Sequence, residues 1–278
     1  MAKVQLTTKY ILSKIDKKLI KIMKYKVMNS FLKINFDFTF HTQKHTLNHI
    51  LKVLITLIKQ NHTWRHLTKY TTYYKRFIQL QKINLFQNTY IELLHRYLNK
   101  TKNNTLKTLY TDTTIIQNKN GINFIKRNKY INNKNCNKLS FVVDSNFIPI
   151  YVKAYTGNVY DSKIIRKDFK NKNLCKFLKH CTYFVADKGY CSKEIRIYLK
   201  NNKITPIIDY NKRCTKDKQK IKTLTASEKE IYKNRNKIEH IFAHLKERHK
   251  LNQRHEKYIK NYMNILYMFL CEMVMNKL

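Results

Sequence analysis

Residues 108–116 read TLYTDTTII, and residues 138–155 read KLSFVVDSNFIPIYVKAY. Both stretches are rich in β-branched and aromatic residues, which favour strands over helices. The polar pair Ser145–Asn146 interrupts the second stretch, and a turn there predicts separate strands over 138–144 and 148–155. Three consecutive strands therefore open this half of the chain.

Downstream of these strands, the sequence alternates between helical and extended patterns. The predicted elements are a helix over 161–178, a strand over 183–187, a helix over 192–199, a strand over 204–208, a long helix over 231–246 and a terminal helix. Three strands followed by such alternation favour an α/β fold, with a mixed sheet flanked by helices. The order is ribonuclease-H-like.

The N-terminal part of the chain has a different pattern. From residue 46 to residue 98, apolar residues recur every three or four positions, which predicts a small all-helical region. Thr71 and Thr72 are expected N-caps of a short helix that exposes Lys75 and Arg76. Short helices with a basic second member resemble a helix-turn-helix, although a bundle with a solvated basic face is the alternative.

Composition limits the class of partner. The 278 residues include 57 Lys and Arg against 17 Asp and Glu, which gives a net charge of +40. No apolar run is long enough to cross a bilayer, so nucleic acid is the expected polyanion and no membrane is expected. An AT-rich gene would also enrich Lys, Asn, Ile and Tyr, so charge alone leaves both explanations open. With only three glycines, the chain lacks a nucleotide-binding phosphate loop, and no nucleotide cofactor is expected.

The segment 231–246, IYKNRNKIEHIFAHLK, concentrates charged residues on one side of its predicted helix. We take Arg235 as the origin and advance about 100° per residue. Lys246, Glu239 and Tyr232 then fall within about 60° of it, beside an apolar stripe. A carboxylate beside two cations suits metal-assisted chemistry on a nucleic-acid backbone.

Two aspartates in the predicted strands complete a set of three acids. Asp112 lies in the middle of the first strand, where a buried carboxylate is costly unless it is paired or metal-bound. Asp187 ends a strand, where ligand sites of α/β sheets gather. Each acid also has a structural interpretation: Asp112 as an edge residue, Asp187 as a helix cap, and Glu239 as the ion-pair partner of Arg235.

The chain resembles the DDE transposases of bacterial insertion sequences. The spacing of Tyr232, Arg235, Glu239 and Lys246 matches the family's Tyr-Arg-Glu-Lys signature. The segments LYTDTTIIQNKNG and FVADKGYCSKEIR resemble the blocks that carry the two aspartates of the family.

This resemblance implies a function, a cofactor and a domain plan. Asp112, Asp187 and Glu239 would hold two Mg²⁺ or Mn²⁺ ions, while Tyr232, Arg235 and Lys246 would hold DNA phosphates. The enzyme would cleave the ends of a mobile element and join the freed 3′-hydroxyl to target DNA. Its partners would be double-stranded DNA and further copies of itself.

The implied domains are a basic extension (1–44), a helical DNA-binding domain (45–105) and a ribonuclease-H-like catalytic domain (106–278), with a polar linker around 99–107. Lys-rich residues 212–222 are expected to form a loop that faces DNA, with a loop that is merely solvated as the alternative. The compartment would follow the host: cytoplasm with the chromosome in a bacterium, otherwise a nucleus or viral factory.

Two other functions remain open from the residues alone. A catalytically inactive or domesticated relative would bind DNA without cutting it. A ribonuclease-H-like nuclease would cut without joining ends.

Overall fold

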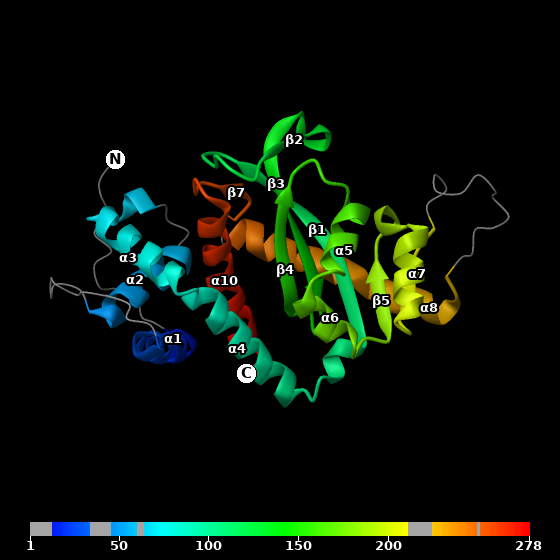
Figure 1. Ribbon diagram of the computed structural model, residues 1–278, viewed down its shortest axis with the longest axis horizontal. Coiled ribbons are helices and arrows are strands. Elements are labelled where there is room, and N and C mark those ends of the chain that lie inside the picture. Colours follow the sequence, from blue (N-terminus) through cyan, green and yellow to red (C-terminus); the bar gives the residue numbers. More distant parts are fainter. Residues whose placement is uncertain (1–12, 34–45, 60–63, 211–223, 249–250) are drawn as a thin grey trace. The chain divides into compact units, whose positions relative to one another are not determined.

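The computed structural model describes residues 13–33, 46–59, 64–210, 224–248 and 251–278 (Figure 1). The chain divides into two compact units, each described separately below. We call them the helical unit (Met1–Tyr97, Glu247–Lys250 and Lys260–Leu278) and the sheet unit (Leu98–Lys246 and Leu251–Ile259). In the part of the chain that is described, no helix combines the length and apolarity needed to cross a membrane.

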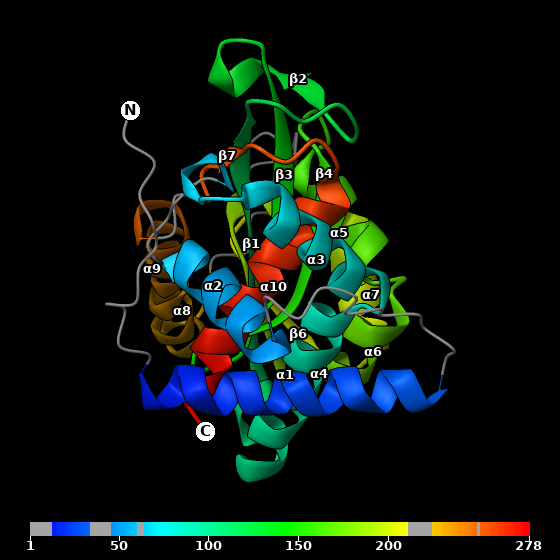
Figure 2. The ribbon, with the colours of Figure 1, turned by 90° about the vertical axis from the view of Figure 1, so that its left-hand side faces the viewer.

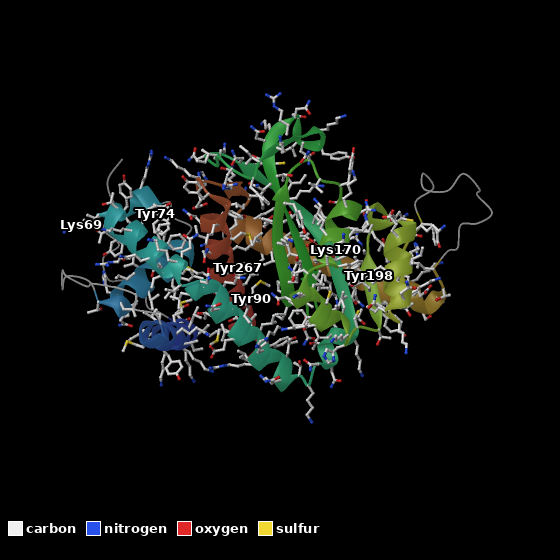
Figure 3. All side chains as sticks on the ribbon, viewed as in Figure 1. Lys69, Tyr74, Tyr90, Lys170, Tyr198 and Tyr267 are labelled. Carbon is white, nitrogen blue, oxygen red and sulfur yellow. The ribbon has the colours of Figure 1, made fainter. Side chains whose placement is uncertain are left out.

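The helical unit packs its N-terminal helices with the C-terminal one. Its elements are α1 (Lys14–Lys33), α2 (Leu47–Lys59), a 3₁₀ turn (Trp64–His66), α3 (Tyr70–Lys82), α4 (Leu85–Lys100) and α10 (Ile259–Met275). Figure 3 shows Tyr90 of α4 beside Tyr267 of α10, with ring centroids 5.7 Å apart. The buried Gln81 of α3 donates a hydrogen bond to Asn261 of α10. The C-terminal helix is therefore part of this unit's core.

Two features of the helical unit differ from the sequence-based expectations. Residues 14–33 form a helix that packs on α2, although no element was expected there. The predicted N-caps at Thr71 and Thr72 are wrong, because α3 begins at Tyr70 and Thr72 N bonds to Lys69 O one turn earlier.

The sheet unit is built on one mixed sheet. Its strands are β1 (Thr108–Asn118), β2 (Lys126–Asn128), β3 (Lys134–Val143), β4 (Pro149–Thr156), β5 (Tyr183–Ala186), β6 (Thr205–Ile208) and β7 (Gln253–Arg254). The order is β2-β3-β1-β5-β6, with β4 also on β3 and β7 also on β1. β3 runs antiparallel to β1 and β4, whereas β5 and β7 run parallel to β1 and β6 parallel to β5.

Helices cover both faces of this sheet. Figures 1 and 2 show α5 (Asp161–Asp168), α6 (Lys172–Leu178) and α7 (Lys193–Asn201) on one face, with α8 (Ala226–Lys233) and α9 (Lys237–Ala243) on the other. The prediction of a ribonuclease-H-like mixed sheet with an N-terminal helical region is confirmed. The helix expected over 161–178 is two helices, because the chain turns between Asp168 and Lys172.

Side chains along β1 alternate between the two faces of the sheet, so neighbouring residues have different surroundings. Asp112 pairs across the sheet with Phe141, whose ring packs on Phe242 of α9 at 5.4 Å. The next residue, Thr113, points to the opposite face and donates a hydrogen bond to Asp161 of α5 at 2.7 Å. Because successive strand residues face opposite ways, Asp112 must face the α8–α9 side.

Candidate active site

Asp112 is a partly buried carboxylate in the central strand. Its side chain is 21% exposed, and its Oδ1 accepts a 2.7 Å hydrogen bond from Thr113 N. Burial is the main cause that raises the pKa of Asp112 from 3.8 to about 6, and the negative charges of Asp187 and Asp161 add to it. The Thr113 N–H and the Arg235 guanidinium act in the opposite direction. The fold therefore holds this acid at a cost, as expected for a carboxylate kept for chemistry.

Asp187 reaches the same site from the neighbouring parallel strand. Ala186, the last residue of β5, pairs with Thr111, so Asp187 follows at the level of Asp112. The hydroxyl of Tyr232 in α8 donates a long hydrogen bond of 3.4 Å to Asp187 Oδ1. Burial raises the pKa of Tyr232, and the negative charge of Asp187 adds to the rise. The phenol therefore remains a neutral donor directed at this carboxylate.

Arg235 links the other two acids. Its Nη1 lies 3.4 Å from Asp112 Oδ2, and its Nη2 lies 3.6 Å from Glu239 Oε1. The guanidinium carbon is 5.8 Å from the ring centre of Tyr232. The Arg235 side chain is only 14% exposed, and its Nε is buried without a hydrogen-bond partner. One donor of this cation is therefore left for a further acceptor.

Within the described residues, no three His, Cys, Asp or Glu side chains form a ready-made metal-binding group. Arg235 lies between Glu239 and Asp112, and the Glu239 side chain is 62% exposed. The donor chemistry nevertheless fits a hard divalent cation, because carboxylate oxygens are its preferred ligands. A cation between Asp112 and Asp187 would also offset the repulsion that raises the pKa of Asp112.

The helix that carries the signature residues is irregular. A 3₁₀ turn over Asn234–Asn236 separates α8 from α9, and a π-helical turn follows over His244–Arg248. The expectation of one uninterrupted α-helix over 231–246 is therefore wrong, and angles counted at 100° per residue shift accordingly. Lys246 lies in the π turn, half-buried, and burial lowers its pKa. No hydrogen bond or ion pair within the described residues joins Lys246 to the three acids.

Polar residues packed on the other face of β1, behind Asp112, were not recognised as neighbours from the sequence. Asp161 is the first residue of α5. It pairs with Lys138 of β3 at 2.8 Å and accepts a hydrogen bond from Thr113. Tyr190 is fully buried, and burial raises its pKa well above the ordinary value, with Asp112 and Asp161 adding to the rise. These contacts join segments that are distant in sequence, so periodicity gave no signal for them.

Asp209 is a further acid at the same end of the sheet. The pairing of Ala186 with Ile208 brings Asp209 beside Asp187 at the carboxyl ends of β5 and β6. Asp209 forms a 3.1 Å ion pair with Lys188. The signal for Asp209 was present in the sequence, because it follows its strand as Asp187 does.

The two basic residues expected to bind DNA lie on α3 of the helical unit. Lys75 is exposed as expected, but Arg76 is half-buried and donates a 2.9 Å hydrogen bond to Gln79. The Lys-rich segment 212–222 lies outside the described residues.

Comparison with known proteins gives a family match and several structural matches. The family model of the transposase DDE domain matches residues 107–273. The crystal structure of the catalytic domain of Mos1 mariner transposase is similar, with a TM-score of 0.35, 15% identity, and coverage of 69% of this chain and 87% of that one. The Mos1 paired-end complex with left transposon end gives a TM-score of 0.36 and 14% identity, covering 99% and 79% of the two chains. No curated protein sequence matches the chain.

The matched region contains all three acids, their neighbours on α8 and α9, and the whole sheet. It spans more than half of the chain. The sheet order, the acids at its centre and strand end, and this match lead to one conclusion: the protein belongs to the DDE transposase family and is a DNA transposase.

Proposed function

We propose that Asp112, Asp187 and Glu239 are the catalytic acids of a transposase of the insertion-sequence type with the Tyr-Arg-Glu-Lys signature. The observation that carries the proposal is a set of three contacts made by two of the signature residues. Arg235 contacts both Asp112 and Glu239, and Tyr232 contacts Asp187. Three acids from three separate elements therefore share one small set of partners.

These acids would hold two Mg²⁺ or Mn²⁺ ions. Bound there, the ions would supply an activated oxygen nucleophile and charge stabilisation of an in-line displacement at phosphorus. For Glu239 to join the other two acids, its exposed side chain must leave Arg235. The raised pKa of Asp112 means that a cation binding there would also displace a proton from a part of the molecules near neutral pH.

The signature cations and phenol would orient the DNA. Arg235, whose buried Nε has no hydrogen-bond partner, would donate to a phosphate oxygen beside Asp112 after its side chain shifts to expose that atom. Tyr232, neutral because its pKa is raised, would hold Asp187 in place or donate to the phosphate. Lys246, with its pKa lowered by burial, would gain most from a phosphate partner, since a nearby anion restores its charge.

DNA binding would be divided between the two units. The net charge of +40 favours extensive phosphate contact. We assign recognition of the element ends to the N-terminal helices, with Lys75 and Arg76 of α3 among the contacts, and catalysis to the sheet unit. Transposition joins two ends, so a homo-oligomer on double-stranded DNA is the proposed working form.

The test compares wild type with Glu239→Gln on DNA that carries the element's ends, with Mg²⁺ or Mn²⁺ present. The matched control is Glu230→Gln, which makes the same change at an exposed residue of α8 paired with Lys233. We expect wild type and Glu230→Gln to nick and join DNA. Glu239→Gln should bind DNA with similar affinity but do neither.

Other outcomes separate the alternatives. If wild type cuts but never joins ends, the chain is a nuclease. If wild type binds cognate ends and neither cuts nor joins them, it is a DNA-binding relic. If Glu239→Gln retains full activity, the assignment of the three acids is wrong.

A further inference from the structure

Residues 119–134 form a projection from the sheet that the proposed chemistry does not use, and we call it the arm. It contains the loop after β1, the short strand β2, a 3₁₀ turn over Lys129–Ile131 and the start of β3. Figure 1 shows it extending from the end of the sheet at β2. Because Gln117 is the last β1 residue paired with β3, the β2–β3 hairpin lies beyond that strand.

The surface of the arm is both basic and apolar. Its five cations are all exposed, and it contains no acid: Lys119, Lys126, Arg127, Lys129 and Lys134. Three large apolar side chains are also exposed: Tyr130 at 81%, Ile122 at 61% and Phe124 at 47%. Exposing such residues together is unfavourable unless they meet a partner. A partner that suits both sets must be an anion with apolar surface.

Arg254, which is fully buried, holds the base of the arm through hydrogen bonds. Arg254 donates to Asn123 O at 2.7 Å, to Asn123 Oδ1 at 2.7 Å and to Asn137 Oδ1 at 3.1 Å. Asn137 in turn donates to the carbonyl of Phe124, which has a φ of 63°. A bulky residue in this left-handed region is strained, and the surrounding hydrogen bonds hold it there.

Of the three glycines in the chain, Gly121 lies within the arm and Gly157 packs against it. A Cβ on Gly121 would lie 2.2 Å from Asn118 Oδ1 and 2.7 Å from Arg254 Cζ. A Cβ on Gly157 would lie 2.2 Å from Cys136 Sγ and 2.8 Å from Lys126 O. In so glycine-poor a chain, using two glycines for this close packing indicates that the position of the arm matters.

The tip of the arm presents Tyr130. Asn128 is buried, donates to Gly157 O at 2.6 Å and accepts from Tyr130 N at 2.8 Å. Asn132 and Asn133 then turn the chain with left-handed φ values of 53° and 55°. The turn therefore fixes the backbone of Tyr130 while leaving its ring in solvent.

We propose that the arm is a second DNA-binding surface, which contacts the duplex away from the cleaved bond. Lys126, Arg127 and Lys129 would contact phosphates, and Tyr130 would enter a groove. From Phe141, opposite Asp112, seven residues lead back along β3 to Lys134. At ~3.4 Å per residue this spans about 24 Å, or about seven base pairs of a duplex lying along the strand.

The first test measures the salt dependence of binding to a labelled DNA duplex for the full chain. The double variant Lys126→Ala/Arg127→Ala should lower the slope of log affinity against log salt by about one to two, and weaken binding roughly tenfold at moderate salt. Tyr130→Ala should weaken binding roughly fivefold without changing the slope.

The matched control removes two exposed cations from α6, as Lys172→Ala/Lys176→Ala. α6 leads into the start of β5, so it lies at the opposite end of the sheet from Asp187. We expect the salt slope of this control variant to equal that of wild type. If the two double variants change the salt slope equally, only net charge matters. If neither variant changes the slope, the arm does not contact DNA. Either result overturns the proposal.

The second test puts the photo-cross-linking residue p-benzoylphenylalanine in place of Tyr130. On DNA that the enzyme cleaves, we expect a protein–DNA adduct about seven base pairs from the cleaved bond. Adducts spread without a preferred distance, or cross-links only to a second copy of the chain, would contradict the proposal. These measurements follow DNA binding rather than cleavage, so this proposal and the assignment of the acids fail separately.

Discussion

Replacing Asp112 with asparagine should stabilise the metal-free protein while removing its activity. The carboxylate is held in a site that raises its pKa from 3.8 to about 6, chiefly because it is buried and also because Asp187 and Asp161 are close. Asparagine has nearly the same shape and carries no charge. The change therefore removes a charge that the fold accommodates at a cost.

The magnitude follows from the difference between the two pKa values of Asp112, which is about two units at ~1.4 kcal/mol each. Because the folded pKa is the higher one, the folded state binds more protons between about pH 4 and pH 6. The free energy of unfolding of the wild type therefore falls as pH rises through this window. The ionised Asp112 carboxylate therefore lowers the free energy of unfolding by about 3 kcal/mol near pH 7.5 and by about 1 kcal/mol near pH 4.5.

The assay is urea denaturation followed by circular dichroism, in a metal chelator, at about these two pH values. The free energy of unfolding of Asp112→Asn should be higher than that of wild type by about 3 kcal/mol at the higher pH and by about 1 kcal/mol at the lower pH. The control is Asp209→Asn, which loses an exposed ion pair with Lys188 and should cost between zero and ~1 kcal/mol. Added Mg²⁺ should stabilise wild type more than Asp112→Asn and narrow the gap.

Two results would refute this reasoning about Asp112. One is an asparagine variant that is no more stable than wild type near neutral pH. The other is a stability gap that does not shrink on acidification, which would mean that the gain comes from packing rather than from the ionised carboxylate.

Further substitutions test the structural claims. Gly157→Ala should lower the free energy of unfolding by about 1–3 kcal/mol, because its Cβ would meet Cys136. Gly189→Ala, whose Cβ would have nothing within 4 Å, should leave the stability unchanged or raise it by about 0.5 kcal/mol. Thermal denaturation compares the two variants, and equal stabilities would contradict the prediction. Arg254→Met should cost at least about 3 kcal/mol because it leaves buried acceptors unpaired, and amide exchange should rise in the arm. Thr225→Ala removes a capping box and should cost about 1 kcal/mol, with faster amide exchange confined to the first turn of α8.

Much of the fold could be predicted because local pattern and tertiary structure agree. The strand rich in β-branched residues around Asp112 became β1, and the Ser145–Asn146 turn joins β3 to β4 as expected. Caps were less predictable, since the start of α3 depends on a left-handed Lys69 rather than on a threonine. Residues 14–33 form a helix that was missed because its charges obscure the apolar stripe that packs on α2.

The candidate site was only partly predictable. Spacing within one segment singled out Tyr232, Arg235 and Glu239, because a signature is a local property. Spacing could not show that the helix breaks into 3₁₀ and π turns, since backbone irregularity depends on what the helix packs against. Nor could it find Asp161 behind Asp112, or the hydrogen bonds of Arg254, which join residues more than a hundred positions apart.

The contribution of α10 to the helical unit has a consequence for the order of synthesis. A ribosome releases α1 to α4 first and the sheet unit next, but Asn261 and Tyr267, the partners of Gln81 and Tyr90, arrive only with α10, after the sheet unit. The helical unit therefore cannot complete its core until the sheet unit and α10 have both been synthesised. A chain that stops before α10 would lack the partners of Gln81 and Tyr90, so the two units cannot fold in simple N-to-C order.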